Sequence, residues 1–395
     1  MHALPPPKQP EKSALLGIYA ERYSPPVLAR VSADGECLDI PRDHRTARAE
    51  RYALKSAAGR LLPQDHRTTK CMRWRVPNQE IQVLQSPATG RAFYHGLQVC
   101  AMPWTCPVCA SKISERRRIE VGTAISPKAE SLGLMVKLLT LTIPHGLGDD
   151  VADICGRMIT ANRKMWQGKY GQKLQRMLGH YGHIRALEVT YGSNGFHPHL
   201  HILVFYHPDQ VQPGAWESLP SVWERCCRLA GLPQPRQPYG CQVDDGSKAA
   251  AYVSKGTWGL ESELTKGVVK DAKNGSRTMY RLLKDYMAGD RQAGAIWALY
   301  AQAFKSKRML VWSKGLKQLL GQAEFSDDEI ANKPDDQQAM LLTAITDDQW
   351  QVIWRRNLQS AVLDLAEVIE HHETGQTVLS RFLHELTLTL ERKAA

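Results

Sequence analysis

The alternation of apolar and polar positions is clearest in the middle of the chain. Residues 184–191 alternate and include β-branched side chains, and residues 199–205 form a short apolar run, so both segments are predicted to be strands. The segment 192–195 between them, Gly-Ser-Asn-Gly, is typical of a tight turn. The pattern therefore predicts a β-hairpin with its turn centred between Ser193 and Asn194.

The predicted turn fixes which side chains meet across the hairpin. Glu188 lies directly opposite His199, and because side chains on a strand alternate between faces, His199 and His201 share one face. A carboxylate and two imidazoles then converge, which is a ligand set that suits a divalent metal ion. A register slip of one residue would separate them. The alternative interpretation is a pair of ordinary strand histidines.

Further segments around the hairpin alternate between strand and helix patterns. In chain order they are a strand at 134–143, a helix at 149–178, the hairpin, a helix at 216–229, a short strand at 242–244 and a helix at 247–255. This βαββαβ order is that of the ferredoxin-like arrangement, an α+β fold with an antiparallel sheet. We expect helices to cover one face of the sheet and the face with the histidines to stay open.

Composition divides the chain into five predicted parts. They are a basic, partly ordered arm at 1–65, a cysteine-containing module with a basic helix at 66–130, the sheet domain at 131–322, an acidic linker at 323–350 and a C-terminal helical hairpin at 351–395. The C-terminal hairpin is expected to pack on the core or to form a homodimer.

Four of the nine cysteines lie in the second of these parts. Cys106 and Cys109 form a Cys-Pro-x-Cys knuckle, Cys100 lies six residues upstream, and Cys71 is the natural fourth ligand. Four thiolates around one ion would make a structural, tetrahedral zinc site with no open position for chemistry. A redox role for Cys106 and Cys109 is the alternative, although no thioredoxin-like context surrounds them.

A cluster of basic residues follows the knuckle, on the predicted helix. Such a run is usually a solvated face, but beside a zinc knuckle it suits contacts with the phosphates of a nucleic acid. The residues that we assign to this contact are Lys112, Arg116, Arg117 and Arg118.

The formal net charge of +11 supports an anionic partner, most often a nucleic acid. No apolar run approaches the length of a membrane helix, and the first residues do not resemble a signal peptide. We therefore expect a cytoplasmic protein without a membrane partner, in which cysteines serve as metal ligands or buried thiols rather than in disulfides.

A candidate nucleophile lies in the predicted helix at 247–255. Ser247 is a suitable N-cap and Gly256 a suitable stop. Tyr252 and Lys255 are three residues apart and so occupy neighbouring positions on one helix face, where the lysine favours the phenolate form of the tyrosine. A lone helical tyrosine is usually a packing residue, and only the nearby metal ligands make Tyr252 a candidate.

These motifs together resemble those of HUH endonucleases and, among them, the rolling-circle replication initiator (Rep) proteins of bacterial plasmids. The resemblance spans roughly residues 70–320. It is carried by His199-Leu200-His201, Tyr252-x-x-Lys255, the upstream strand segment 139–142, the cysteine knuckle, and the segments 187–190 and 311–316.

The resemblance implies an HUH nuclease core that nicks single-stranded DNA at a hairpin origin. Glu188, His199 and His201 would hold Mg²⁺ or Mn²⁺. Tyr252 would attack the scissile phosphate, leaving a 5′-phosphotyrosine and a free 3′-hydroxyl for a host polymerase, with a host helicase as a further partner. Lys255 would balance charge in the transition state. His197, on the same face by parity, is assigned to a DNA contact or to support of the metal ligands, with an ordinary turn residue as the equal alternative.

One position departs from the family pattern. Some relatives carry a glutamate four residues before the tyrosine, whereas this chain has Lys248, which we assign to DNA binding. The group that would complete the termination reaction stays open. The candidates are Asp244, Asp245, Glu261 or Glu263 as a base and Tyr280 or Tyr286 as a second nucleophile.

Two other functions compete with a replication initiator. A transposase or a relaxase would share the chemistry, although relaxases of this class usually carry the tyrosine ahead of the histidines and here it follows them. A non-enzymatic, zinc-containing nucleic-acid-binding protein would form no covalent adduct with DNA.

Overall fold

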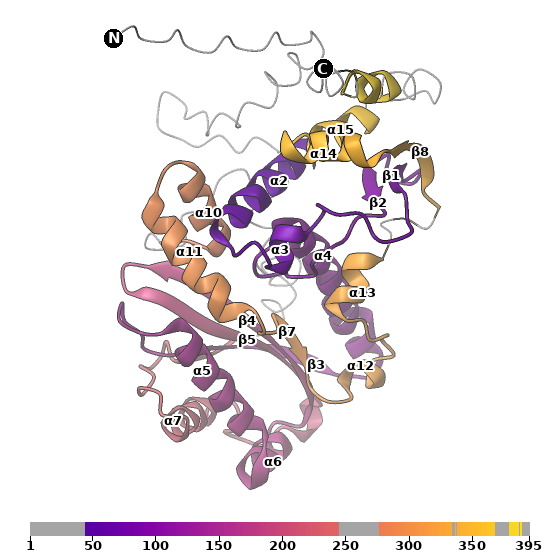
Figure 1. Ribbon diagram of the computed structural model, residues 1–395. Helices are drawn as coiled ribbons and strands as arrows, with labels where there is room; N and C mark the ends of the chain where they lie inside the picture. Colours follow the sequence, from indigo (N-terminus) through magenta and orange to yellow (C-terminus); the bar gives the residue numbers. More distant parts are fainter. Residues whose placement is uncertain are drawn as a thin grey trace, which may run out of the picture. The chain divides into compact units, whose positions relative to one another are not determined.

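The structure is a computed structural model that describes residues 44–244, 276–333, 336, 338–367, 379–386 and 388 (Figure 1). The chain divides into two compact units. The first comprises the described residues of Met1–Tyr52, Met72–Gln98 and Pro334–Ala395, and the second comprises those of Ala53–Cys71 and Val99–Lys333. Helix α2 (His44–Leu61) contributes its first half to one unit and its second half to the other.

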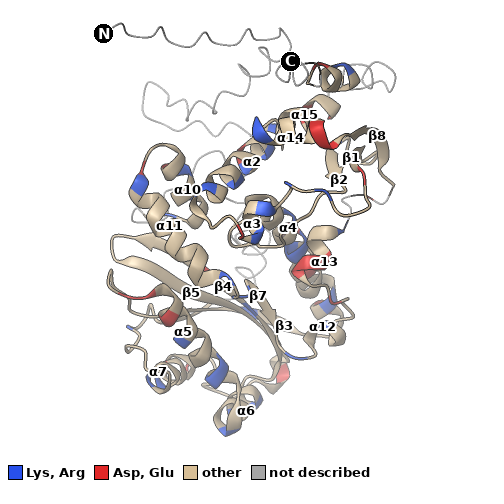
Figure 2. Ribbon diagram, in the orientation of Figure 1, with Lys and Arg blue, Asp and Glu red and all other residues tan. Residues whose placement is uncertain are grey.

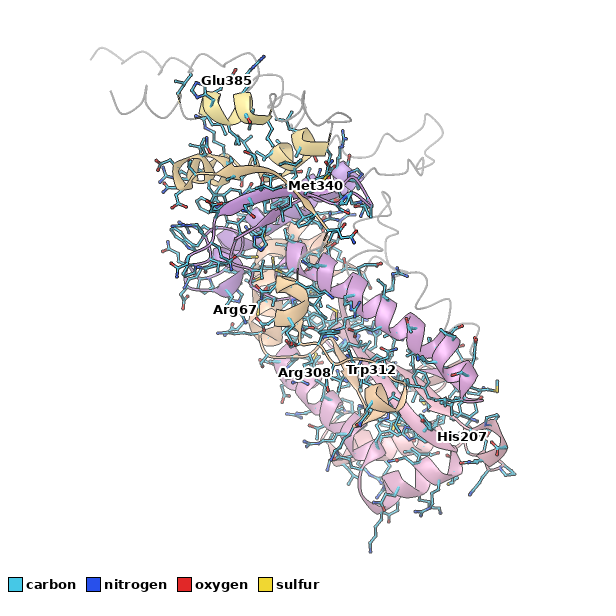
Figure 3. The ribbon with its side chains drawn as sticks, turned by 90° about the vertical axis from the view of Figure 1, so that its right-hand side faces the viewer. Arg67, His207, Arg308, Trp312, Met340 and Glu385 are labelled. Carbon is cyan, nitrogen blue, oxygen red and sulfur yellow. The ribbon has the colours of Figure 1, made fainter. Side chains whose placement is uncertain are left out.

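The second unit is built on a five-stranded antiparallel sheet in the order β6-β3-β5-β4-β7. Figure 3 labels Trp312 on the edge strand β7, and His207 directly after β5. The βαββαβ order predicted from the pattern is observed, since β3 is followed by α5 and α6, then by β4 and β5, then by α7 and β6. The strands are β3 (Met135–Thr142), β4 (His180–Gly192), β5 (Gly195–Tyr206), β6 (Cys241–Asp244) and β7 (Leu310–Trp312).

The β4–β5 hairpin has the predicted register. Gly192 pairs with Gly195 around a two-residue turn, and Glu188 pairs with His199. Gly195 has a φ of +85°, and a Cβ atom there would lie 3.0 Å from the carbonyl oxygen of Gly146. Only glycine fits this turn without strain, so the turn that sets the register is itself fixed by the sequence.

Three helices, α5 (Val151–Trp166), α6 (Gly168–Met177) and α7 (Leu219–Leu229), lie together on one side of the sheet (Figure 1). The single helix predicted at 149–178 is wrong, because the chain breaks at Gln167, which is extended, and at Gly168, which has a φ of +70°. A Cβ at Gly171 would collide with the carbonyl of Trp166, so α6 packs closely against the end of α5.

The remaining helices of the second unit surround the sheet and the cysteine cluster. They are α3 (Arg67–Lys70), α4 (Pro107–Thr123) with its continuation η1 (Ala124–Ala129), η2 (Pro208–Gln210), α10 (Met279–Met287), α11 (Arg291–Phe304), α12 (Leu316–Leu319) and α13 (Asp327–Asn332). The helix predicted at 247–255 lies outside the described residues.

The sheet has an apolar core on each face, which corrects the expectation of an open histidine face. Leu200, Ile202 and Val204 pack toward α5, α7 and α11. Leu203 and Phe205, which share a face with the histidines, pack in a second core. The other members of this second core include Val121 of α4, Ala124 and Ala129 of η1, and Leu316 and Leu320 at α12. The histidine face is therefore covered over the part of β5 that lies beyond His201.

The first unit contains a three-stranded antiparallel sheet in the order β2-β1-β8. Its strands are β1 (Ile81–Gln85), β2 (Ala92–His95) and β8 (Met340–Ile345), and its helices include α14 (Asp347–Arg355) and α15 (Gln359–Glu367). The helical part of 379–386 also belongs to it.

The acidic linker predicted at 323–350 is wrong, because most of this segment is regular structure. It holds α13, β8 and the start of α14. Five of its acidic residues lie in the first turns of α13 and α14, where Ser326 and Thr346 form capping boxes. Carboxylates at these positions are stabilised by the unpaired N–H groups of the helix N-terminus, so the charge marks helix starts and not a solvated connection.

The two ends of the chain also differ from expectation. Residues 44–61 of the predicted arm form helix α2. The continuous helical pattern after residue 353 is divided between α14 and α15 at Asn357, which has a φ of +55°. The predicted break at Gly375 lies outside the described residues.

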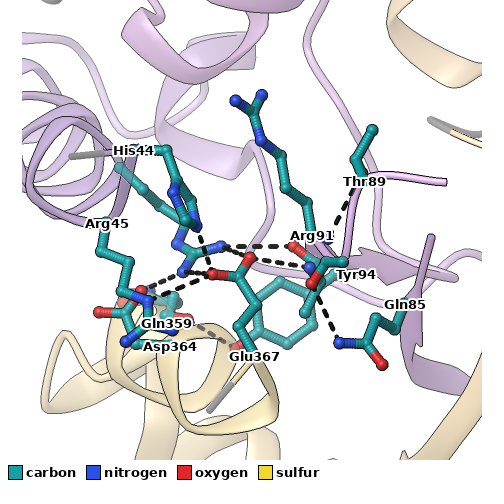
Figure 4. A network of polar contacts seen from close by, with 12 residues as sticks. His44, Arg45, Gln85, Thr89, Arg91, Tyr94, Gln359, Asp364 and Glu367 are labelled. Carbon is teal, nitrogen blue, oxygen red and sulfur yellow. Dashed lines mark hydrogen bonds and ion pairs between the residues drawn. The ribbon is translucent and has the colours of Figure 1, made fainter. Parts of the chain in front are cut away.

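A buried ion-pair network joins α2 to α15 in the first unit (Figure 4). Arg48 donates hydrogen bonds to Asp364 and, at 2.6 Å, to Glu367. Glu367 also accepts from the backbone N–H of Ala92 at 2.8 Å and contacts Nε2 of His44 at 2.6 Å. Burial alone would raise the pKa of Glu367, but the hydrogen bonds from Arg48 and His44 lower it, so the carboxylate is charged.

We expect Arg48→Met to lower the free energy of unfolding by about 3–5 kcal/mol, because it leaves the buried, charged carboxylate of Glu367 without its main counter-charge. Urea unfolding measures the loss. Arg45→Met is the matched control, since Arg45 is partly exposed and contacts Glu367 at 3.6 Å, and it should cost about 1 kcal/mol or less. Equal losses in the two variants would contradict a dominant role for the buried pair.

Candidate functional site

Glu188, His199 and His201 converge on the histidine face of the sheet. The Oε2 atom of Glu188 lies 3.1 Å from Nε2 of His199 and 3.2 Å from Nε2 of His201. The two histidine side chains are 14% exposed and the glutamate side chain is 33% exposed. Strand alternation on β5 and the register with β4 produce this arrangement without any irregular backbone.

The donor set and its spacing fit a divalent cation. Ligand atoms about 2.1 Å from one ion and at right angles to one another lie about 3 Å apart, which is close to the two observed separations. Two imidazoles and one carboxylate leave further coordination positions for water or for a substrate oxygen. These three residues are one of two groups with metal-binding geometry among the described residues.

Thr140 of β3 orients one of the two imidazoles. It pairs with His201 in the β3–β5 register, and its Oγ1 lies 3.1 Å from Nδ1 of His201. When Nδ1–H of His201 donates to Thr140, the lone pair is placed on Nε2, the atom that faces Glu188. Thr140 therefore selects the tautomer that can bind a cation.

Glu188, His199 and His201 also shift one another's pKa values. Burial opposes ionisation of Glu188, but the adjacent imidazoles outweigh it and keep the pKa of Glu188 well below its ordinary value. Burial likewise lowers the pKa of His201, whereas the pKa of His199 is raised because the attraction of Glu188 exceeds the effect of burial. A metal ion binds a carboxylate and neutral imidazoles, so Glu188 and His201 are in the charge state that a cation requires, and binding of a cation at His199 would displace its proton.

A second pair of histidines lies beside these ligands. Nε2 of His145 is 2.6 Å from Nδ1 of His197, and Nδ1 of His145 is 3.0 Å from the carbonyl oxygen of Asn194. Burial and the neighbouring His199 and His145 lower the pKa of His197 to about 4, so it is neutral near pH 7. The sequence reasoning missed His145, which follows β3 in the chain and carries no spacing signal of its own.

The second metal-binding group is formed by Cys71, Cys100, Cys106 and Cys109, all of which are buried. Sγ of Cys109 lies 3.6 Å from Sγ of Cys71 and 3.6 Å from Sγ of Cys100, and Sγ of Cys106 lies 3.7 Å from that of Cys71. Four sulfurs around a zinc ion at 2.3 Å would be about 3.8 Å apart, whereas a disulfide requires about 2.05 Å. The spacing therefore fits a tetrahedral metal site.

Helix starts and special backbone conformations position the four thiols. Cys106 is the N-cap of α4 and Cys109 lies in its first turn, where the helix dipole favours thiolates. Cys71 ends α3 and is followed by Met72, which has a φ of +53°, and Cys100 is followed by Ala101, which has a φ of +50°. The pKa of Cys109 is lowered by hydrogen bonds from the other thiols, led by Cys100.

The basic residues after the knuckle already have partners in the structure. Arg117 binds Glu120 and Asp327, each at 2.8 Å, while Arg116 and Arg118 pair with Glu120 and Glu115 respectively. Lys112 donates to the backbone carbonyl of Lys333. A phosphate would therefore have to compete with these partners.

The other predicted site residues fall in two groups. Tyr252, Lys255 and Lys248 lie outside the described residues, as do Asp245, Glu261 and Glu263. Of the described candidates for termination, Tyr280 is buried and its hydroxyl donates to the carbonyl of Pro103 at 3.0 Å, and Tyr286 packs against Gly294. Asp244 on β6 is close enough to His201 to act on it electrostatically, so it is the described candidate nearest the histidine face.

Comparison with known proteins places the chain in a family. Residues 92–341 match the model of a family described as replication protein. The chain belongs to this replication-protein family. It is also similar to the protein rep of Streptomyces lividans, with 25% identity over 382 residues that cover 78% of this chain and 83% of that protein. No solved structure matches the chain.

Membership of the replication-protein family confirms the resemblance to plasmid replication initiators. The matched range contains the Glu188, His199 and His201 group and three of the four clustered cysteines, whereas Cys71 lies before it. None of the described helices is both long and apolar enough to span a membrane.

We expect the purified protein to contain about one tightly held zinc ion per chain, and Cys106→Ser to lose it, because three thiolates cannot complete the tetrahedral site. Elemental analysis after gel filtration measures the metal content. Cys241→Ser is the control, since Cys241 is buried outside the cluster and should leave the zinc in place. Retention of zinc in Cys106→Ser would rule out the four-cysteine site.

We expect Thr140→Val to weaken Mn²⁺ binding about 10-fold, because the substitution removes the hydrogen bond that fixes the His201 tautomer and keeps the β-branched shape. Calorimetric titration measures the affinity. Thr142→Val lies on the same strand, but the Thr142 hydroxyl donates to the carbonyl of Tyr239, so it should have little effect. Similar affinities in the two variants would argue against orientation by Thr140.

Proposed function

We propose that this replication protein initiates plasmid replication by nicking single-stranded origin DNA with a tyrosine nucleophile, in the manner of an HUH endonuclease. The observation that carries the proposal is the single carboxylate oxygen of Glu188 that faces Nε2 of both His199 and His201. This geometry lies within the range that matches the replication-protein family, and the chain has a net charge of +11.

In this proposal, Glu188, His199 and His201 hold Mg²⁺ or Mn²⁺. The bound cation supplies a Lewis acid that polarises the scissile phosphate. The residues of the chain itself do three things. The rigid hairpin fixes the direction of the two imidazoles, Thr140 fixes the tautomer of His201, and the apolar core next to His201 limits the access of water.

The proposed reaction transfers the phosphate from DNA to the protein. The Tyr252 hydroxyl gives up its proton as its oxygen forms a bond to phosphorus, the bond from phosphorus to the 3′ oxygen breaks, and that oxygen takes up a proton and leaves as a 3′-hydroxyl. Lys255 balances the negative charge in the transition state. The products are a 5′-phosphotyrosine and a 3′ end that a host polymerase extends, with a host helicase opening the duplex ahead of it.

The remaining proposed contacts are to DNA. His197 is neutral and paired with His145, and we propose that it touches the strand or supports the metal ligands. Lys248 and the cluster of Lys112, Arg116, Arg117 and Arg118 are proposed to contact phosphates, although the described members of that cluster would first exchange their present partners. The family match supports replication over transposition or conjugation.

We expect the wild-type protein to form a covalent adduct with 5′-labelled or 3′-labelled single-stranded origin DNA in Mn²⁺, and Tyr252→Phe to form none, because it lacks the attacking oxygen. A denaturing gel shows which labelled fragment moves with the protein. Tyr239→Phe is the control, since Tyr239 is an exposed tyrosine of the same unit and should leave the adduct unchanged.

The same assay tests the metal ligands. Glu188→Gln should slow nicking about 100-fold or more by weakening the hold on the cation, whereas Glu217→Gln, an exposed carboxylate before α7, should have no effect. Nicked DNA without an adduct would exclude the tyrosine mechanism. Binding of DNA without nicking or adduct would favour a non-enzymatic DNA-binding protein.

A further inference from the structure

Seven lysines and arginines of the described part of the second unit lie on α5, α6 and α7, on the side of the sheet away from Glu188, His199 and His201. Figure 2 shows Lys and Arg in blue on all three helices. We call this surface the α5–α7 basic face. Its members are Arg163 and Lys164 on α5, Lys169, Lys173 and Arg176 on α6, and Arg225 and Arg228 on α7.

The sheet separates this face from the metal ligands. Leu187 and Leu200, which point away from Glu188 and His199, pack in the core that contains Met165 of α5, Leu174 of α6 and Trp223 of α7. The three helices therefore form a layer over the opposite side of the sheet. A ligand held on their outer surface does not occupy the metal-binding face.

None of the seven cations has an ion pair with an acidic side chain of the described residues. The acidic side chains on the same helices are engaged elsewhere. Asp153 of α5 pairs with Arg157 at 2.9 Å, and Glu224 of α7 accepts from Gln237 at 3.0 Å. This contrasts with Arg116, Arg117 and Arg118 of α4, each of which pairs with a carboxylate.

The three helices that carry these side chains pack together, with α5 against both α6 and α7. Lys169, Lys173 and Arg176 recur at spacings of four and three residues, so they lie along one side of α6, opposite the buried Leu174. The guanidinium of Arg225 lies 3.6 Å from the ring centre of Tyr170, which joins α7 to α6. Arg225 and Lys164 both act on the thiol of Cys226, which places α5 at the same junction.

We infer that the α5–α7 basic face binds the phosphate backbone of double-stranded DNA without regard to sequence. Long, exposed and unpaired lysines and arginines suit phosphates, where each contact releases condensed counterions. Single-stranded DNA is usually held by several exposed aromatic rings, whereas the described residues of α5, α6 and α7 offer one, Tyr170, and Arg225 stacks on one side of its ring. The surface therefore favours a duplex.

This inference goes beyond the proposed function. A replication origin contains duplex DNA on both sides of any single-stranded segment. The α5–α7 basic face would hold this duplex while the site on the other side of the sheet acts on one strand. Binding of the duplex would keep the protein on the origin and raise the local concentration of the single strand at the site. The inference holds whether or not the protein nicks DNA.

The test measures binding of the full-length protein to a fluorescent 30-base-pair duplex of unrelated sequence without divalent ions. We expect Lys169→Gln, Lys173→Gln and Arg176→Gln together to raise Kd about 10-fold or more at 0.1 M salt. The slope of log Kd against log salt should fall by up to about 2.7, or about 0.9 for each lost phosphate contact. A second variant, Arg163→Gln with Lys164→Gln and Arg228→Gln, should behave similarly.

A control with the same loss of formal charge separates location from net charge. Arg67→Gln, Arg157→Gln and Arg281→Gln together remove three exposed or partly exposed arginines, each of which has a carboxylate partner. This control should change Kd by about 2-fold or less. Thermal unfolding checks that all three variants are folded.

Three results would overturn the inference. The wild-type protein could fail to bind the duplex at 0.05 M salt, the α6 variant could match the control, or the loss could occur with single-stranded DNA alone. Because the duplex carries no origin and no metal is present, none of these results depends on nicking, and a failed nicking assay leaves this test intact.

Discussion

The register of the β4–β5 hairpin is the constraint on which the metal-binding geometry depends. A slip of one residue would turn Glu188 toward the helix-covered core and leave two imidazoles without a carboxylate. Two features prevent the slip. Gly195 has a positive φ and no room for a side chain, so the turn cannot move along the sequence. Near the site, the apolar residues of both strands alternate with Glu188, His199 and His201, so a slip would move apolar side chains out of the core.

The cysteine cluster and the metal ligands are linked through one helix. Helix α4 begins at Cys106, and its last turns place Val121 in the core on the histidine face, with Ala124 of η1. This core abuts the part of β5 that carries His201. A metal ion at the cysteines would therefore anchor the helix that lines the second site, and the low polarity of that core strengthens the attraction between Glu188 and the imidazoles.

Local patterns predicted the parts of the fold that depend on neighbours in sequence. The hairpin and its register followed from alternation and from one turn, and three ligands of the cysteine cluster followed from a short motif. Parts that depend on distant partners were missed. Strand β8 is an apolar segment in acidic surroundings, and it is a strand because β1 pairs with it. Residues 202–205 are apolar at consecutive positions, which is typical of a strand buried on both faces and indicates that part of the histidine face is covered. The pattern does not predict which helix covers it.

A surface that binds anions is hard to predict from the linear sequence, because a basic side chain attracts a ligand strongly only if no neighbouring carboxylate neutralises it. The run Arg116–Arg118 is the most conspicuous basic feature near the cysteines. Glu115 and Glu120 lie at the helical spacings that neutralise it, and buried Glu120 also binds Lys317 at 3.2 Å.

Lys169, Lys173 and Arg176 are dispersed among neutral residues, so they do not form a basic run in the linear sequence. They become a stripe only when α6 forms, and no acidic residue lies within that helix to cancel them. Helical periodicity thus places carboxylates beside the arginines of α4 and brings the cations of α6 onto one side of their helix. The positions of the acidic side chains, more than the number of basic ones, decide where a polyanion can bind.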